Sequence, residues 1–217
     1  MIKLTQKDKY KITSDWKSVY PSYHKYKNLQ LVKRYGPLIF GIYLKPVYGE
    51  EHYVPVFFIN SLLTPMNTLS LNVQKSLINT KNVEDSISLI KHNKDFYNVS
   101  IKFTQQVLLL NINNITFSSI QDYYKNCINT ESGYPINAIT DYLNFLLWCE
   151  KKELFQQELN HYYDFIKHFP ADIQFSFKLN FKDLMDNYSL NATNKIIDDN
   201  LNRFNLIELI ENKIILE

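Results

Sequence analysis

The chain has 217 residues, of which 45% are hydrophobic and 15% aromatic, and its formal net charge is +2 at neutral pH. This length and composition exclude a disordered chain and predict one domain over residues 1–217, with residues 1–28 as a basic segment that can be peripheral. No apolar run is long enough to cross a bilayer, and the lysine-rich start lacks a hydrophobic signal region. We therefore expect a cytoplasmic protein without a membrane partner.

The first half of the chain is rich in β-branched and aromatic residues, which predicts an antiparallel meander. A short helix over residues 15–20 is expected before it. The strands are expected at residues 29–34, 38–45, 52–60 and, extending the sheet, 69–73. Pro55 has no N–H to give to a ladder, so we expect its strand to be an edge strand or to carry a bulge.

The rest of the chain favours helices. Apolar residues at helical spacing predict helices over residues 83–97, 116–127, 193–211 and, most strongly, 137–169, which is either one helix or two joined near Lys151. Alternation predicts a short strand at 99–103, whereas 107–112 fits either a strand or a buried helix.

Residues 173–181 alternate apolar and polar side chains without a fault over nine positions. A helix would spread these apolar side chains around its whole circumference, so the pattern predicts a late strand. The sequence thus predicts an α+β fold. A mostly antiparallel sheet from the N-terminal half, joined by this late strand, would pack against several helices of the C-terminal half.

Motifs for cofactors and metals are missing. The four glycines do not cluster into a phosphate-binding or dinucleotide-binding loop, so we expect no cofactor. The nearest approach to a ligand set is Glu158, His161, Asp164 and His168 on the expected long helix. A ferritin-type centre needs a second Glu-x-x-His, and a zinc hydrolase needs His-Glu-x-x-His. We therefore predict no metal site.

The start of the chain is basic: residues 1–35 contain nine Lys or Arg against two acids, with tyrosines and Trp16 between them. Lysines neutralise phosphates and aromatic rings stack on bases, so this segment has the ingredients of a nucleic-acid surface. Its candidate contact residues are Lys25, Lys27, Lys33 and Arg34. The competing interpretation is that the basic start packs against the acidic end of the same chain.

The end of the chain is acidic: residues 183–217 contain seven acids against three Lys or Arg. Asp198, Asp199, Glu208 and Glu211 are candidates for contact with a basic protein partner, because complementary charge steers association. The competing interpretation is a solvent-facing charged surface with no partner.

The chain has 22 lysines, two arginines and 24 asparagines, a skew typical of an AT-rich bacterial genome. Without a catalytic motif, the sequence favours a non-enzymatic protein-binding module. Our leading hypothesis is an immunity-type inhibitor that neutralises a partner bacterial toxin by covering its active surface, and the alternative is a nucleic-acid-binding protein. A third hypothesis is an enzyme without a known motif, which predicts a deep pocket gathering carboxylates with two or more of His24, His52, His161 and His168.

Overall fold

The computed structural model describes residues 4–47, 51–110, 112, 114–131 and 135–217. Its main sheet has the order β1-β2-β3-β4-β5, with β6 added to β4 and β8 added to β2. Among the ladders of this sheet that the described residues form, only the β2–β8 pair is parallel. The strands are β1 (His24–Lys27), β2 (Gln30–Tyr35), β3 (Leu38–Pro46), β4 (His52–Ser61), β5 (Val73–Ser76), β6 (Ile87–Ser88) and β8 (Glu211–Asn212). A separate parallel pair joins β7 (Ile115–Thr116) to β9 (Ile214–Ile215).

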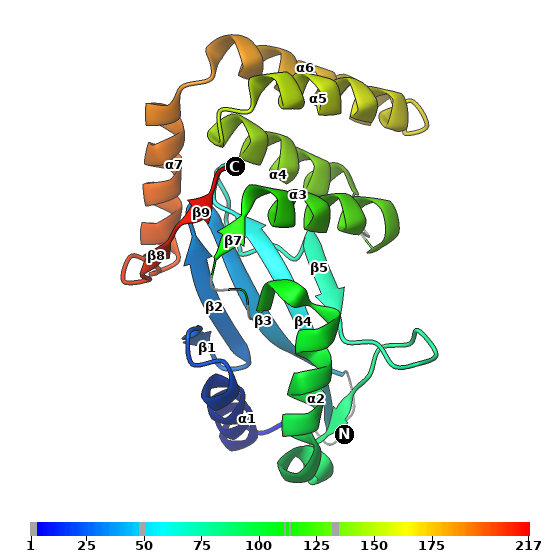
Figure 1. The fold of residues 1–217 in the computed structure, drawn as a ribbon, viewed down its shortest axis with the longest axis vertical. Coiled ribbons are helices and arrows are strands. Elements are labelled where there is room, and N and C mark those ends of the chain that lie inside the picture. Colours follow the sequence, from blue (N-terminus) through cyan, green and yellow to red (C-terminus); the bar gives the residue numbers. More distant parts are fainter. Residues whose placement is uncertain (1–3, 48–50, 111, 113, 132–134) are drawn as a thin grey trace.

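The described residues contain seven α-helices, most of them in the C-terminal half. They are α1 (Gln6–Val19), α2 (His92–Gln106), α3 (Phe117–Asn126), α4 (Pro135–Trp148), α5 (Lys152–Ile166), α6 (Ala171–Asn187) and α7 (Leu190–Arg203). Figure 1 shows α1 and α2 together at one end of the molecule and α3 and α4 toward the other, with α5 and α6 beyond them. This arrangement of an N-terminal antiparallel sheet and mostly C-terminal helices confirms the α+β class.

The central strands β3 and β4 are buried over almost their whole length. Gly41 of β3 lies opposite Phe58 of β4, and a Cβ at position 41 would be 2.0 Å from Phe58 Cζ. The phenyl ring therefore fills the space that any other residue at position 41 would need. This close approach explains why a glycine occupies this position of the strand.

The expectation of an edge strand or a bulge at Pro55 is wrong, because β4 lies between β3 and β5 and its register with β3 continues unbroken through Pro55. Pro55 falls between the β6 ladder, which reaches Tyr53, and the β5 ladder, which starts at Val56. Its carbonyl accepts a hydrogen bond from Leu77 N–H at 2.8 Å. Neither β5 nor β6 pairs with position 55, so neither strand loses a hydrogen bond because Pro55 has no N–H.

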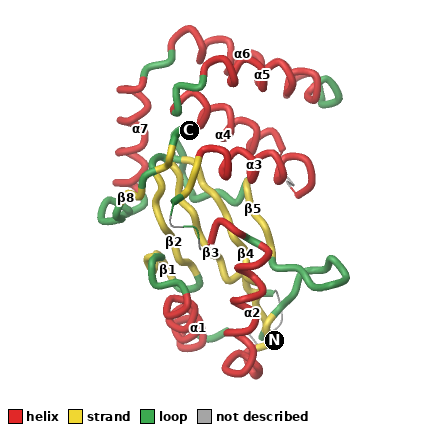
Figure 2. Tube along the Cα trace, viewed as in Figure 1, coloured by secondary structure: helices red, strands yellow, loops and turns green. Residues whose placement is uncertain are grey.

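The predicted late strand at 173–181 is wrong, because these residues lie in α6, which Figure 2 shows as a helix beside α5 and away from the sheet. The helix buries Phe177 and Phe181, which are four residues apart, and leaves Phe175 69% and Leu179 50% exposed. Alternation thus divides the apolar side chains between two faces of a helix. Packing against α5 outweighs the strand pattern, since a strand also needs a neighbour with which to share hydrogen bonds.

The helix predicted at 116–127 is confirmed: α3 starts after Thr116, whose Oγ1 accepts a hydrogen bond from Ser119 N–H at 3.2 Å. The expected long helix is two helices, α4 and α5. They separate at Glu150, whose φ of 57° lies in the left-handed region and ends α4. Local caps and breaks therefore set these boundaries.

Other boundaries differ from the predictions. The helix expected at 83–97 starts only at His92, and the strand expected at 99–103 is the continuation of this helix. His92, Ser100 and Phe103 share its buried face, so a helical face, rather than alternation, explains the apolar positions. Leu108–Leu110 form a 3₁₀ turn, and the last helix ends at Arg203 rather than near residue 211.

The first helix belongs to the core. Trp16 of α1 is fully buried, and its ring stacks on Tyr20 and meets Tyr53 and Phe103 edge-on. Thr5 caps the start of α1 and forms a reciprocal capping box with Asp8. The described part of the basic N-terminal segment is therefore packed onto the sheet and onto α2.

Candidate functional site

The four basic candidates lie on the strands at one edge of the main sheet. Lys25 and Lys27 are on β1, and Lys33 and Arg34 are on β2. Three of their side chains lie over tyrosine rings of the same chain: Lys25 over Tyr10 at 4.1 Å, Lys27 over Tyr26 at 4.7 Å and Lys33 over Tyr35 at 4.8 Å, from Nζ to the ring centroid. These cations already interact with aromatic faces.

The aromatic side chains of the basic segment are mostly unavailable to nucleic-acid bases. Trp16, Tyr20, Tyr23 and Tyr35 are each at most 2% exposed. Stacking on bases requires an exposed ring face. Because these rings are buried, most aromatic side chains of the segment cannot stack on bases. The charge of the lysines is then the main feature that supports nucleic-acid binding.

The acidic and basic candidate sets meet at one ion pair. Arg34 Nη2 lies 2.9 Å from Glu211 Oε2, and Arg34 Nε donates to the carbonyl of Gly36 at 2.9 Å. Parallel pairing of β2 with β8 aligns Arg34 with Glu211, and Asn212 Nδ2 donates to the carbonyl of Arg34 at 2.9 Å. The basic start thus packs against the acidic end, and Arg34 and Glu211 form an ion pair with each other.

The other acidic candidates remain at the surface. Asp198 and Asp199 are exposed on α7, and Glu208 is exposed on the segment that follows this helix. On the same segment Ile207 is 60% exposed and Ile210 is 83% exposed. We call Asp198, Asp199, Ile207, Glu208 and Ile210 the acidic-apolar surface.

The segment that carries these isoleucines is firmly held. Phe204, Leu206 and Leu209 are buried between the exposed positions. Leu206 N–H donates to the carbonyl of Leu201 at 2.8 Å, and Leu209 N–H donates to the carbonyl of Leu206 at 3.1 Å. The two large apolar side chains are therefore presented to solvent from an ordered backbone, which lowers the entropy cost of binding a partner.

A cleft of about 570 Å³ lies beside this surface, where β1 and β8 share the outer edge of β2. Its lining includes Lys33 and Arg34 of β2 with Glu208 and Ile210 of the acidic-apolar surface. Lys17 also lines it, and its Nζ donates to the carbonyls of Pro21 and Tyr23. The cleft thus combines charges of both signs with an exposed apolar side chain.

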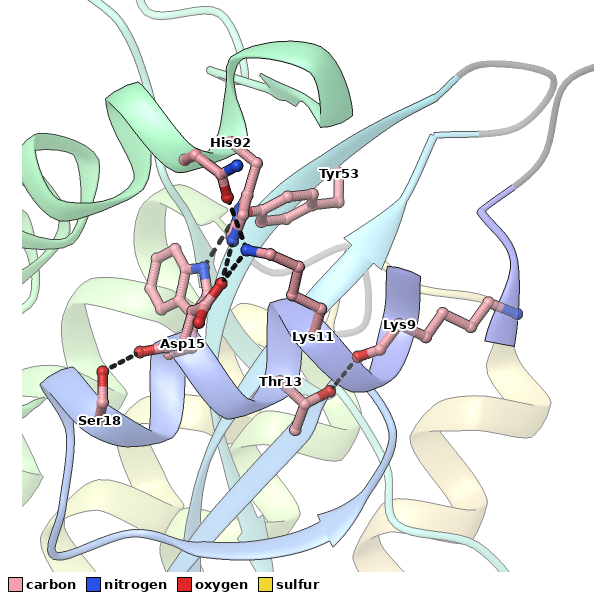
Figure 3. Close-up of polar contacts among 9 residues, drawn as sticks. Lys9, Lys11, Thr13, Asp15, Ser18, Tyr53 and His92 are labelled. Carbon is pink, nitrogen blue, oxygen red and sulfur yellow. Dashed lines mark hydrogen bonds and ion pairs between the residues drawn. The ribbon is translucent and has the colours of Figure 1, made fainter. Parts of the chain in front are cut away.

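A buried polar network, which no pattern in the sequence indicates, joins α1, α2 and β4 (Figure 3). Tyr53 OH accepts from Trp16 Nε1 at 3.0 Å and contacts His92 Nδ1 at 2.7 Å. His92 Nε2 contacts Asp15 Oδ2 at 2.8 Å, and Lys11 Nζ contacts the same oxygen at 2.7 Å. Each of the buried polar groups in this network therefore has a partner.

The electrostatics of this network suit a structural role. Burial lowers the pKa of His92, although its bond to Asp15 acts in the opposite direction. Burial also opposes ionisation of Asp15, but hydrogen bonds with Lys11 and His92 bring its pKa below the ordinary value. A neutral His92 that donates from Nε2 to Asp15 and accepts from Tyr53 at Nδ1 satisfies all these contacts. The Tyr53 hydroxyl is enclosed, so it does not face a substrate cleft.

A second buried group, also without a sequence signal, lies between α3 and α4. Burial raises the pKa of Asp141 to about 7, and a hydrogen bond with Asn72 acts in the opposite direction. Neither Asp141 Oδ2 nor Tyr124 OH hydrogen-bonds to any described residue. Asp141 is therefore a carboxyl group for which ionisation in the folded state is costly.

Three of the four histidines that the enzyme hypothesis names line separate clefts, and the fourth, His168, is exposed in the turn after α5. The three clefts hold His52 with Asp85 and Asp95 in one of about 470 Å³, His24 with Glu208 in that of about 570 Å³, and His161 with Glu158 in one of about 340 Å³. Each of these three histidines therefore has a carboxylate in its cleft but no second histidine. A site that uses two of these histidines is not formed by these clefts.

The ligand-like set on the expected long helix is also dispersed. Glu158 is buried on α5 and pairs with Lys125 at 2.5 Å, whereas Asp164 is exposed and pairs with Lys167 at 2.6 Å. Among the residues that the structure describes, no three His, Cys, Asp or Glu side chains form a group able to hold a metal ion.

Comparisons with known proteins found no matching family model, curated protein or solved structure. Within the described part of the chain, no helix has the length and apolar character needed to cross a membrane.

Proposed function

We propose that this chain is a non-enzymatic protein-binding module that acts through its acidic-apolar surface. The kind of module we propose is an immunity-type inhibitor, which covers the active surface of a partner bacterial toxin. The observation that carries the proposal is the exposure of Ile207 and Ile210, 60% and 83%, on a backbone anchored by buried neighbours. Large apolar side chains held in solvent beside charged groups are typical of interaction sites.

The charges around this surface favour a basic partner. Asp198, Asp199 and Glu208 are exposed, and the nearby Arg203 is turned toward its own chain, where Nη1 donates to the carbonyl of Met66 at 2.9 Å. The positive charge of Arg203 is thereby held against the loop that contains Met66. A partner with a basic rim around an apolar recess would complement the acidic carboxylates and the two isoleucines.

The test is affinity capture of the tagged protein from its host, with and without nuclease, using three forms of the chain. The first is unchanged, the second carries Ile207→Ser and Ile210→Ser, and the third is a control with Phe175→Ser, at an exposed apolar position on α6. We expect one protein to be retained by the unchanged and control forms and lost, by at least about tenfold, from the double variant. Equal retention by all three forms would exclude this surface.

The charge part of the proposal has its own measurement. Asp198→Asn with Asp199→Asn should slow association with the captured partner and weaken its dependence on salt, because rim charges act mainly on the association rate. Material that is lost on nuclease treatment would instead favour the basic strands β1 and β2. For an immunity-type inhibitor, co-expression with the partner should also abolish the toxicity of that partner in cells.

A further inference from the structure

The cleft of about 570 Å³ beside the acidic-apolar surface contains two lysines whose charges are not neutralised. Lys17 lies in the last turn of α1 and Lys33 lies on β2, and both line the cleft and are half-buried. Among the described residues, no carboxylate forms an ion pair with either ammonium group. Moving a charge out of water without an opposite charge costs free energy, so these lysines favour an anion in the cleft.

Both lysines also retain hydrogen-bonding capacity. An ammonium group has three N–H donors. Lys17 Nζ donates to the carbonyls of Pro21, at 2.7 Å, and Tyr23, which holds the nitrogen in place and leaves one donor. Lys33 Nζ lies 4.8 Å from the centroid of the Tyr35 ring, a contact that involves no oxygen acceptor. The two lysines therefore still have N–H donors for an oxygen acceptor in the cleft.

The other charges leave the cleft positive. Arg34 and Glu211 neutralise each other in their 2.9 Å ion pair. Glu208 is the one carboxylate among the described residues of the lining, so the two lysines outnumber it. Asp198 and Asp199 lie on α7, outside this lining. A basic cleft thus adjoins the acidic-apolar surface.

A protein side chain suits these surroundings better than a nucleic acid does. A nucleic-acid strand carries a phosphate at each nucleotide, so a strand held by Lys17 and Lys33 would bring further negative charges toward Glu208. A protein can instead place a single carboxylate in the cleft and an apolar residue on Ile210. Ile210 is 83% exposed and also lines the cleft, so both contacts can be made together.

We propose that this cleft binds a carboxylate side chain, an Asp or Glu of the protein partner, through Lys17 and Lys33. The inference deepens the proposed function and rests on it, because the occupant belongs to the partner that covers the acidic-apolar surface. Such a partner presents charges of both signs: one acidic side chain for the cleft, and basic residues for Asp198 and Asp199. The contact also fixes the register of the complex, since like charges would meet in other orientations.

The first test uses the purified full chain and no partner. The α-amide of N-acetylglutamate supplies the carboxylate, and the α-amide of N-acetylglutamine is a neutral probe of nearly the same shape. Both are titrated at constant ionic strength while NMR follows the backbone amides of Lys33, Arg34 and Asn212. We expect saturable shifts in the millimolar range with the glutamate probe alone.

Variants of the same cleft should change this binding in opposite directions. Lys33→Gln removes a positive charge and should raise the dissociation constant about threefold, whereas Glu208→Gln removes a negative charge and should lower it. The control Lys178→Gln, at an exposed position on α6, should leave it unchanged. Equal shifts with both probes, or equal effects of Lys33→Gln and Lys178→Gln, would overturn the site. Tighter binding of dimethyl phosphate, which represents a nucleic-acid backbone, would overturn the choice of a carboxylate.

The second test identifies the occupant by affinity capture with the same two lysine variants. We expect Lys33→Gln to lose the captured protein at least about fivefold and Lys178→Gln to retain it, because a desolvated carboxylate would lose its counter-charge. Equal retention would overturn the occupant. If the unchanged chain captures no protein but binds the glutamate probe, the proposed function and the occupant fail and the carboxylate site stands. If a protein is captured through Ile207 and Ile210 but the probe does not bind, this inference alone fails.

Discussion

Replacing Asp141 with asparagine tests the electrostatics of the buried region between α3 and α4. This carboxyl is 7% exposed, and burial raises its pKa from the ordinary 3.8 to about 7. That difference corresponds to about 4 kcal/mol between the protonation states. The asparagine side chain has nearly the same shape, remains neutral at every pH, and its carbonyl oxygen can still accept a hydrogen bond from Asn72.

The sign of the effect follows from proton binding. Well below pH 3.8 the carboxyl is protonated in both the folded and the unfolded chain, so its burial does not reduce the free energy of unfolding through ionisation. Between pH 3.8 and about 7 the unfolded chain has lost this proton and the folded chain retains it, so the stability of the wild type falls as pH rises. Asp141→Asn removes this slope. At pH 8 the variant should therefore exceed the wild type by about 4 kcal/mol more than it does at pH 3.5.

The assay is urea unfolding at several pH values, followed by the fluorescence of Trp16 and Trp148. The contributions of other titrating groups cancel in the difference between variant and wild type. Asp199→Asn is the matched control for the substitution itself, because this carboxyl is exposed on α7. A constant difference between Asp141→Asn and wild type from pH 3.5 to pH 8 would refute the reasoning.

Two further substitutions probe the packing around β3 and β4. Tyr53→Phe leaves Trp16 Nε1 and His92 Nδ1 without their partner, so the free energy of unfolding should fall by about 1–3 kcal/mol, and an unchanged urea midpoint would contradict the buried network. Gly41→Ala puts a methyl group into the ring of Phe58 and should destabilise by about 1–3 kcal/mol or more; a neutral or stabilising effect by thermal unfolding would show that the ring can move aside at little cost.

Much of the candidate site could be listed from the sequence, but its final composition could not. Charge counts identified Asp198, Asp199 and Glu208, which are exposed, and also Glu211, which pairs with Arg34. That pairing was open as an alternative, because it depends on whether two segments about 180 positions apart become neighbours. The helix expected over residues 193–211 ends at Arg203, so Ile207 lies beyond it and is exposed.

Short-range physics is sufficient to predict the strands at 29–34, 38–45 and 52–60, the helix capped by Thr116, and the α+β class from the sequence. Hydrophobic period, caps and turn residues act within a few positions of each other, so they can be read from a single chain. The helical state of 173–181 depends on tertiary contacts, because the same alternation fits a strand with a neighbour or a helix packed on α5. The contact of His92 with Asp15, 77 positions away, depends on the fold in the same way, since a polar side chain is buried wherever the fold brings it a partner.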